Sequence, residues 1–106
     1  MPHFFLKLVA PRPNFPTDMN EVEKALMQEH LVYWKEHLQK GDVVVFGPVM
    51  DPAGTYGMGV VEAADEGGAR AFVAGDPTME ANCGFKCEIY PMRAVTRDTV
   101  NREHRE

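Results

Sequence analysis

Two of the expected β-strands are apolar on both of their faces, and this feature constrains the fold more than any other. In residues 3–10, apolar side chains fill neighbouring positions, beginning with Phe4 and Phe5, and residues 42–47 include four apolar residues in succession. Successive side chains of a strand point to opposite faces of its sheet. A sheet built from these strands therefore needs cover on both sides, because exposed apolar patches of this size are rare on monomers.

The longer of two predicted helices spans residues 18–40. Asp18 followed by Glu21 forms a capping-box pattern at its start, and Gly41 suits the position after its last turn. Apolar side chains at spacings of three and four predict the face that meets the core. These side chains are Met27, Leu31, Trp34 and Leu38. The neighbouring stripe of the helix is expected at the edge of that face.

The remaining elements complete a β-α-β-β-α-β order. A strand at 56–63 precedes a second helix at 66–74, and a last strand covers 83–92. This is the order of a ferredoxin-like α+β fold, with a four-stranded antiparallel sheet and two helices on one face. Because the helices cover only one face, the doubly apolar strands predict a homodimer that packs through its sheets.

A proline-rich segment, residues 11–16, follows the first strand. Its three prolines in six positions predict a stiff loop without helix. The loop is interpreted either as a connector or as a lid beside a pocket, with Arg12 and Phe15 as the side chains of interest. The connector is the simpler interpretation.

Composition limits the classes of partner. The 106 residues fit one domain, which we expect at residues 1–94, followed by a polar tail at 95–106. A net charge of −5 without a basic cluster argues against nucleic acid or a membrane surface as a partner. The chain shows neither a leader pattern nor an apolar run near the ~18 residues of a membrane span. A cytoplasmic protein is therefore expected.

The two cysteines, Cys83 and Cys87, are expected to remain reduced thiols. Residues four apart in a strand are separated by about 13 Å, beyond the ~7 Å Cα separation that a disulfide allows. A shared metal ion is equally disfavoured, and the sequence has no cofactor-binding motif. We therefore predict neither a metal nor a cofactor.

His30 and Asp76 are the residues best suited to carry chemistry. His30 lies about 60° from the centre of the predicted core face of its helix, at the edge of a potential pocket. Asp76 follows the second helix, and side-by-side packing of the two helices could bring it to His30. The carboxylate would then set the imidazole tautomer for general acid–base work. Alternatively, His30 is a structural boundary residue and Asp76 a turn residue before Pro77.

Four further residues are candidates for substrate binding, namely Gly47, Pro48, Tyr56 and Tyr33. The first two end or bend the second strand at the expected pocket rim. In the third strand, Gly57 and Gly59 alternate with larger residues, which predicts that another backbone or a ligand comes close on that side.

The same residues carry a resemblance to a known family. They form an ordered series of short motifs: His30-Leu31 with Tyr33-Trp34, Leu38 and Gly41; Phe46-Gly47-Pro48; Ala69 with Phe72-Val73 and Asp76-Pro77; and Ile89 with Pro91. In this spacing, residues 3–92 resemble the YciI-like (YCII/DGPF domain) proteins. The resemblance implies a dimeric α+β barrel with a pocket near His30 and Asp76. It also implies an enzyme, since one member is associated with dehydrochlorination of a hydroxylated aromatic compound.

The chain departs from the family pattern at Met27, where members often carry an arginine three residues before the histidine. If that arginine binds an anionic substrate, the contact is absent here. We predict a small cofactor-independent enzyme that abstracts a proton from, or eliminates a group from, a small organic molecule. His30 would be the acid and base, and Asp76 would orient it. The alternative is a noncatalytic dimer that binds a small ligand or another protein.

Overall fold

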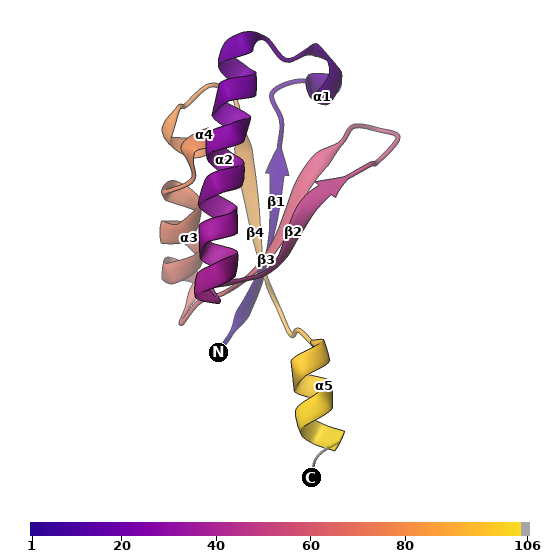
Figure 1. Ribbon diagram of the computed structural model, residues 1–106, viewed down its shortest axis with the longest axis vertical. Coiled ribbons are helices and arrows are strands. Elements are labelled where there is room, and N and C mark those ends of the chain that lie inside the picture. Colours follow the sequence, from indigo (N-terminus) through magenta and orange to yellow (C-terminus); the bar gives the residue numbers. More distant parts are fainter. Residues whose placement is uncertain (105–106) are drawn as a thin grey trace.

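The protein is built on one antiparallel sheet of four strands in the order β2-β3-β1-β4. The computed structural model describes residues 1–104, and the side chains of residues 1–100 (Figure 1). The strands are β1 (His3–Val9), β2 (Val43–Val49), β3 (Tyr56–Glu62) and β4 (Lys86–Met92). β1 pairs with both β3 and β4, and β2 pairs with β3. This topology confirms the predicted ferredoxin-like α+β fold.

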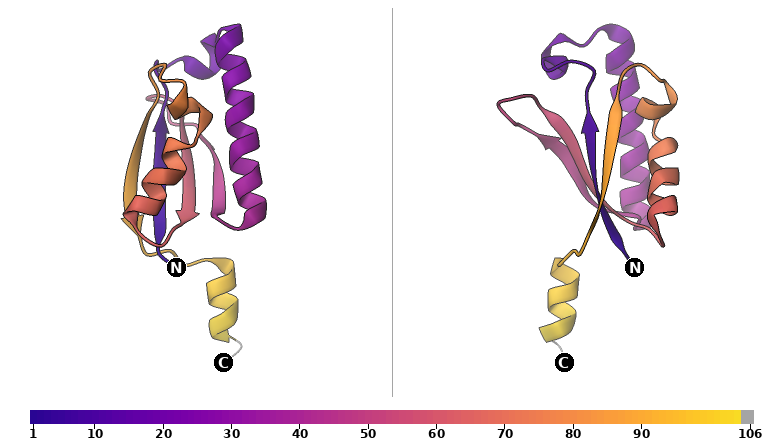
Figure 2. Two further views of the ribbon diagram at one scale, coloured as in Figure 1. Left: turned by 90° about the vertical axis from the view of Figure 1, so that its left-hand side faces the viewer. Right: turned by 180° about the vertical axis from the view of Figure 1, so that it is seen from behind.

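Helices α2 (Glu21–Lys40) and α3 (Glu66–Ala74) lie on one face of the sheet, as predicted (Figures 1 and 2). The other helices are α1 (Phe15–Asp18), α4 (Pro77–Glu80) and α5 (Arg97–His104). α5 extends away from the sheet, and the last part of the predicted tail, 105–106, lies outside the described residues. Within residues 1–104, no helix combines the length and the hydrophobicity needed to cross a bilayer.

The capping box of α2 is present, but not at the predicted residues. Asn20 caps the helix: its side chain accepts the backbone N–H of Glu23, and the Glu23 carboxylate accepts the backbone N–H of Asn20. Arg12 also donates two hydrogen bonds of 2.9 Å to Glu23, and these lower the pKa of Glu23 to about 2. Asp18 instead ends α1. At the other end, Gly41 adopts a φ of 98° and closes α2 as predicted.

The buried face of α2 is rotated from the predicted one. Leu26 and Trp34 are buried, whereas Leu31 and Leu38 are 41% and 42% exposed. The stripe that includes His30 was expected at the edge of the core. His30, Tyr33 and His37 of this stripe are partly buried, in agreement with that expectation. The side chains of His30 and Tyr33 reach toward the second helical segment, where His30 bonds to Asp76 and Tyr33 bonds to a backbone carbonyl of α3.

The proline-rich segment contains a helical turn that the sequence argued against. α1 begins at Phe15 with Pro16 in its first turn, where a proline removes no hydrogen bond because those N–H groups have no partner within the helix. Phe15 is buried and packs edge to face on Phe85, with ring centroids 5.0 Å apart. Arg12 binds Asp18 as well as the first turn of α2, so the segment is tied to the body of the protein.

β2 does not end at Gly47-Pro48 but continues to Val49. Pro48 is tolerated because β2 is an edge strand, where a missing N–H need not break the sheet. Gly47 and Pro48 pair instead with Met58 and Gly57 of β3.

β4 begins at Lys86, three residues later than predicted. The preceding residues form a turn in which Asn82 and Gly84 have φ angles of 50° and 105°. Cys83 lies in this turn and is exposed, whereas Cys87 lies in β4. Both are free thiols, as predicted.

Gly59 of β3 allows the core to close. The main core cluster lies between the sheet and the helices; its buried residues are Phe4, Leu6, Trp34, Val43, Val61, Ala69 and Val73. A Cβ atom at position 59 would lie 2.2 Å from Cζ3 of Trp34. The prediction of a close approach to this strand is therefore correct, but the group that approaches is an indole ring.

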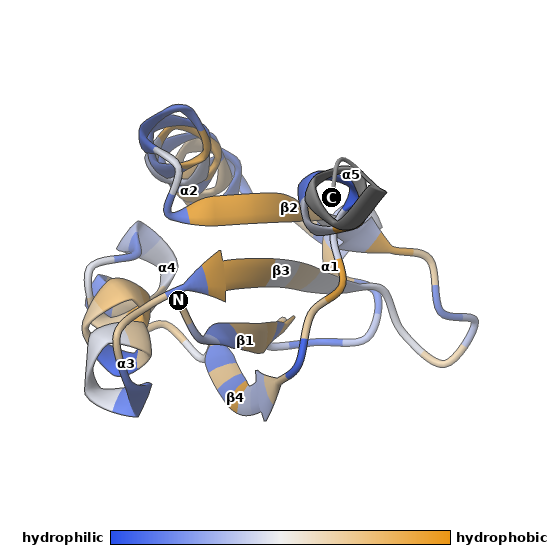
Figure 3. Cartoon of the chain, turned by 90° about the horizontal axis from the view of Figure 1, so that it is seen from below, coloured by the Kyte–Doolittle hydropathy of each residue, from blue (hydrophilic) through white to orange (hydrophobic). Residues whose placement is uncertain are grey.

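No helix of residues 1–104 lies over the second face of the sheet (Figure 2). The register places Phe5 opposite Val60, and Val60 opposite Val45, on this face. Val45 is 49% exposed, and Tyr90 and Met92 of β4 are exposed as well. Figure 3 shows β2 in strongly hydrophobic colours. We call this surface the open sheet face; it is the apolar face that the strand pattern predicted.

Replacing Gly59 by Ala is expected to destabilise the protein by about 1–3 kcal/mol, because the added methyl group overlaps the Trp34 ring in a packed core. Gly57→Ala is the matched control, since a Cβ there meets Leu8 at an ordinary 3.4 Å. Chemical denaturation of both variants measures the difference. Equal stability of the two variants would show that the Trp34 ring is free to move away from β3.

Candidate active site

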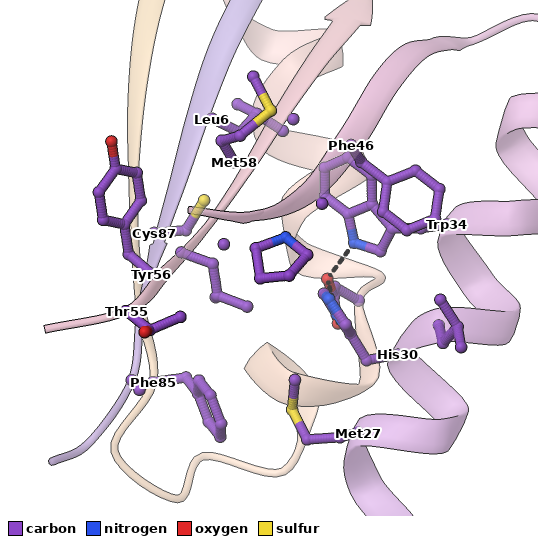
Figure 4. A pocket seen from close by; sticks show the side chains of 18 of the residues that line it. Leu6, Met27, His30, Trp34, Phe46, Thr55, Tyr56, Met58, Phe85 and Cys87 are labelled. Carbon is purple, nitrogen blue, oxygen red and sulfur yellow. Dashed lines mark hydrogen bonds and ion pairs between the residues drawn. The ribbon is translucent and has the colours of Figure 1, made fainter. Parts of the chain in front are cut away.

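A cavity of about 370 Å³ lies between α2 and the sheet (Figure 4). Its walls come from all four strands and from α1, α2, α3 and α4. The side chains that line it are mostly apolar, and His30 and Asp76 lie together on one wall. The volume falls within the roughly 300–1,000 Å³ that is usual for small-molecule sites.

Asp76 is held at this wall as the N-cap of α4. Its Oδ1 accepts the backbone N–H of Thr78 at 2.9 Å and the Thr78 hydroxyl at 2.8 Å. Its Oδ2 accepts the indole N–H of Trp34 at 2.6 Å and lies 2.9 Å from Nδ1 of His30. The Asp76 side chain is 4% exposed, and its oxygens accept from donors of both α2 and α4.

These donors decide the charge of Asp76. Burial by itself raises the pKa of the carboxyl group, because a charge is less stable away from water. The hydrogen bond and charge of His30, with the hydrogen bonds of Trp34 and Thr78, act in the opposite direction, and the pKa is lowered overall. Asp76 is therefore an ionised acceptor at neutral pH.

The other ring nitrogen of His30, Nε2, is not bonded to Asp76. Because the Asp76 carboxylate can only accept, we assign the proton of a neutral His30 ring to Nδ1. The His30 side chain is 14% exposed and lines the cavity, and Nε2 has no hydrogen-bond partner among the described residues. Nε2 is thus the atom that can exchange a proton with a bound molecule.

A model of the YCII-related domain family matches residues 3–93. The chain belongs to this family. The structure of 5-chloro-2-hydroxyhydroquinone dehydrochlorinase from Burkholderia phenoliruptrix AC1100, in complex with 2,5-dihydroxybenzoquinone, is similar to this YCII-family chain. The two share 21% sequence identity and a TM-score of 0.61, over 87% of this chain and 95% of the dehydrochlorinase. This likeness shows a shared fold. No curated protein matches the chain.

Of the four residues predicted to bind substrate, three line the cavity and Tyr33 does not. Gly47 and Pro48 line the cavity. Tyr56 also contributes to the wall, but its ring lies under the ammonium group of Lys7, 4.6 Å from it, and points away from His30 in Figure 4. Tyr33 does not line the cavity; its hydroxyl donates to a backbone carbonyl of α3 at 2.7 Å.

The sequence analysis missed that Trp34 and Thr78 donate hydrogen bonds to Asp76. Asp76 followed by Pro77 is the pattern of an N-cap with proline at the first helical position, so α4 and the donation from Thr78 could have been predicted. Trp34 lies four residues after His30 and so shares its helix face. That its N–H reaches Asp76 depends on contacts distant in sequence and carries no local signal.

Two more histidines pair with carboxylates, but neither pair lines the cavity. His37 of α2 lies 2.8 Å from Asp42, and His3 lies 3.2 Å from Glu62. Within the described residues, no three His, Cys, Asp or Glu side chains are grouped closely enough to hold a metal ion.

Asp76→Asn is expected to lower the free energy of unfolding by about 1–3 kcal/mol at neutral pH, because an amide NH₂ would face the N–H groups of Trp34 and His30. The Asp76 pKa lies below its ordinary value of about 3.8. Its ionisation therefore stabilises the protein fully above that value and loses its effect as the pH falls further. Denaturation of both proteins at neutral and acidic pH should show a gap that narrows in acid.

Asp65→Asn is the control for this substitution, because Asp65 is an exposed N-cap of α3 and asparagine caps helices equally well. Its stability should remain within about 0.5 kcal/mol of the wild type. ¹⁵N NMR of His30 provides a second measurement: the wild type should show the Nδ1–H tautomer, and Asp76→Asn the Nε2–H tautomer. An unchanged tautomer would contradict the role of Asp76.

Proposed function

We propose that this YCII-family protein is an enzyme that moves a proton on a small, mainly apolar organic molecule. His30 is the general acid and base, and Asp76 orients it. The observation that carries the proposal is the pair formed by His30 Nδ1 and Asp76 at 2.9 Å in the cavity wall. The second ring nitrogen of His30, Nε2, has no hydrogen-bond partner among the described residues.

The geometry supports both directions of proton transfer. As a base, Nε2 takes a proton from an O–H or C–H group of the substrate, and the electron pair of that bond remains on the substrate. The imidazolium that forms is stabilised by the carboxylate of Asp76, which is itself held by Trp34 and Thr78. As an acid, the same Nε2–H returns a proton to another atom.

Elimination is the reaction class that the comparisons support. The similar structure is that of a dehydrochlorinase. Loss of HCl from a chlorinated hydroxyaromatic ring can proceed by removal of a hydroxyl proton and protonation of the carbon that bears chlorine. Removal of a second hydroxyl proton then expels chloride with the electron pair of the C–Cl bond. One group that alternately takes and gives protons, as proposed for His30, serves every one of these steps.

His30→Gln is expected to reduce turnover by ~10²–10⁴-fold, the usual contribution of a general acid–base group. Chloride release from 5-chloro-2-hydroxyhydroquinone measures the rate. His37→Gln is the matched control, because His37 belongs to the same helix and also pairs with an aspartate, but does not line the cavity. This control should retain the wild-type rate.

Two results would count against the proposed activity. If His30→Gln turned over as fast as the wild type, the acid–base assignment would fail. If the wild type did not accelerate chloride release over buffer, the noncatalytic interpretation, a dimer that binds a ligand, would be favoured for this substrate.

We further propose that two copies associate through the open sheet face. The support is the apolar surface that the helices of one chain leave uncovered, including Val45 at 49% and Tyr90 at 48% exposure. Burying such a surface against its own copy gives a closed, twofold dimer. The partner is therefore a second copy of this chain.

Val45→Glu is expected to shift the protein from dimer to monomer, because it introduces a charge on the apolar surface that the proposed interface buries. Val32→Glu is the control: Val32 lies on α2 and is 57% exposed. Light scattering should report a dimer for the wild type and for Val32→Glu. A monomeric wild type at micromolar concentration would refute the proposed dimer.

A further inference from the structure

Within residues 1–100, no side chain with a full positive charge lines the cavity. Among the described residues that line it, none is a lysine or an arginine. Arg12, in the segment beside it, is occupied by Asp18 at 3.0 Å and Glu23 at 2.9 Å. The cavity walls thus offer an anionic ligand no counter-charge apart from His30 itself.

The His30–Asp76 pair does not supply a net positive charge either. Asp76 is ionised, since its pKa is lowered. The pair therefore carries a net charge of −1 when the imidazole is neutral, and zero when it is protonated. An anion that entered the cavity would lose its hydration and lie near a buried carboxylate, and both effects oppose binding.

The remaining walls suit aromatic rings. Five of the seven methionines of the chain line the cavity, namely Met19, Met27, Met50, Met58 and Met79. Thioether side chains adapt their shape readily and make favourable contacts with ring edges. His30 and Asp76 form a polar part of this mostly apolar lining.

We infer that the cavity selects an uncharged, mainly apolar ring molecule whose polar edge meets Nε2 of His30, and Met27 is the position at which we test this preference. Met27 lies one helical turn before His30 on α2 and lines the same cavity. A basic side chain at this position would reach into the site and offer an anion the missing counter-charge. The inference rests on the proposed function only in taking this cavity as the ligand site.

Acetophenone and benzoate are suitable probes, because they have nearly the same shape and differ in charge at neutral pH. Trp34 is the only tryptophan of the chain and lines the cavity, so its fluorescence and the NMR signal of its indole N–H report binding. The wild type should bind acetophenone about tenfold more tightly than benzoate, or better.

Met27→Arg should reverse this preference, with benzoate affinity rising about tenfold. Val32→Arg is the charge-matched control, because it adds the same group on the exposed side of α2, outside the cavity lining. It should keep the wild-type ratio of affinities. Met27→Lys, with its flexible stem, repeats the test if the arginine variant does not fold.

Two results would overturn the inference: benzoate binding as tightly as acetophenone to the wild type, or no binding of either probe at millimolar concentration. A ratio of affinities that changes equally in Met27→Arg and Val32→Arg would show that the missing charge inside the cavity does not cause the preference. These binding measurements are independent of turnover. The failure of His30 as a catalyst would therefore leave the charge preference intact, and the reverse also holds.

Discussion

The buried carboxylate of Asp76 is the constraint on which the rest of the site depends. A carboxylate as deeply buried as that of Asp76 is stable in its charged form only when hydrogen-bond donors surround it. The donors come from two helices: His30 and Trp34 of α2, and Thr78 of α4. Satisfying one acceptor thus decides how α2 is rotated and where α4 begins. The same contacts leave Nε2 of His30 as the free nitrogen of the pair.

The rotation of α2 has consequences for packing as well as for chemistry. The indole N–H of Trp34 is directed at Asp76, and its ring lies over β3 at Gly59. A side chain at position 59 would overlap the ring. Leu31 and Leu38 are correspondingly left 41% and 42% exposed. The polar pair and the apolar core are therefore parts of one arrangement, and a change at Gly59 is expected to disturb both.

Local patterns predicted the elements, and long-range contacts determined what the patterns could not. Two-sided apolar strands, the Gly41 cap and the helix order are visible in the sequence because neighbouring residues carry each signal. The core face of α2 was predicted correctly at Trp34 but wrongly at Leu31 and Leu38, since the hydrogen bonds that rotate the helix join residues 46 and 42 positions apart. The short helix α4 was missed because Asp76-Pro77 was interpreted as a turn.

Spacing and residue type also fail to distinguish the two histidine–aspartate pairs of α2. His37 and His30 lie on the same stripe, and each places Nδ1 within 3 Å of a carboxylate oxygen. The pairs differ in surroundings: the side chain of Asp42 is 51% exposed, whereas that of Asp76 is 4% exposed. Water screens the charges of the His37–Asp42 pair. The His30–Asp76 pair lies at an apolar cavity, where a proton gained or lost by His30 changes the electrostatic energy of a bound molecule more strongly. Burial, and not the pair itself, makes His30 the candidate for chemistry.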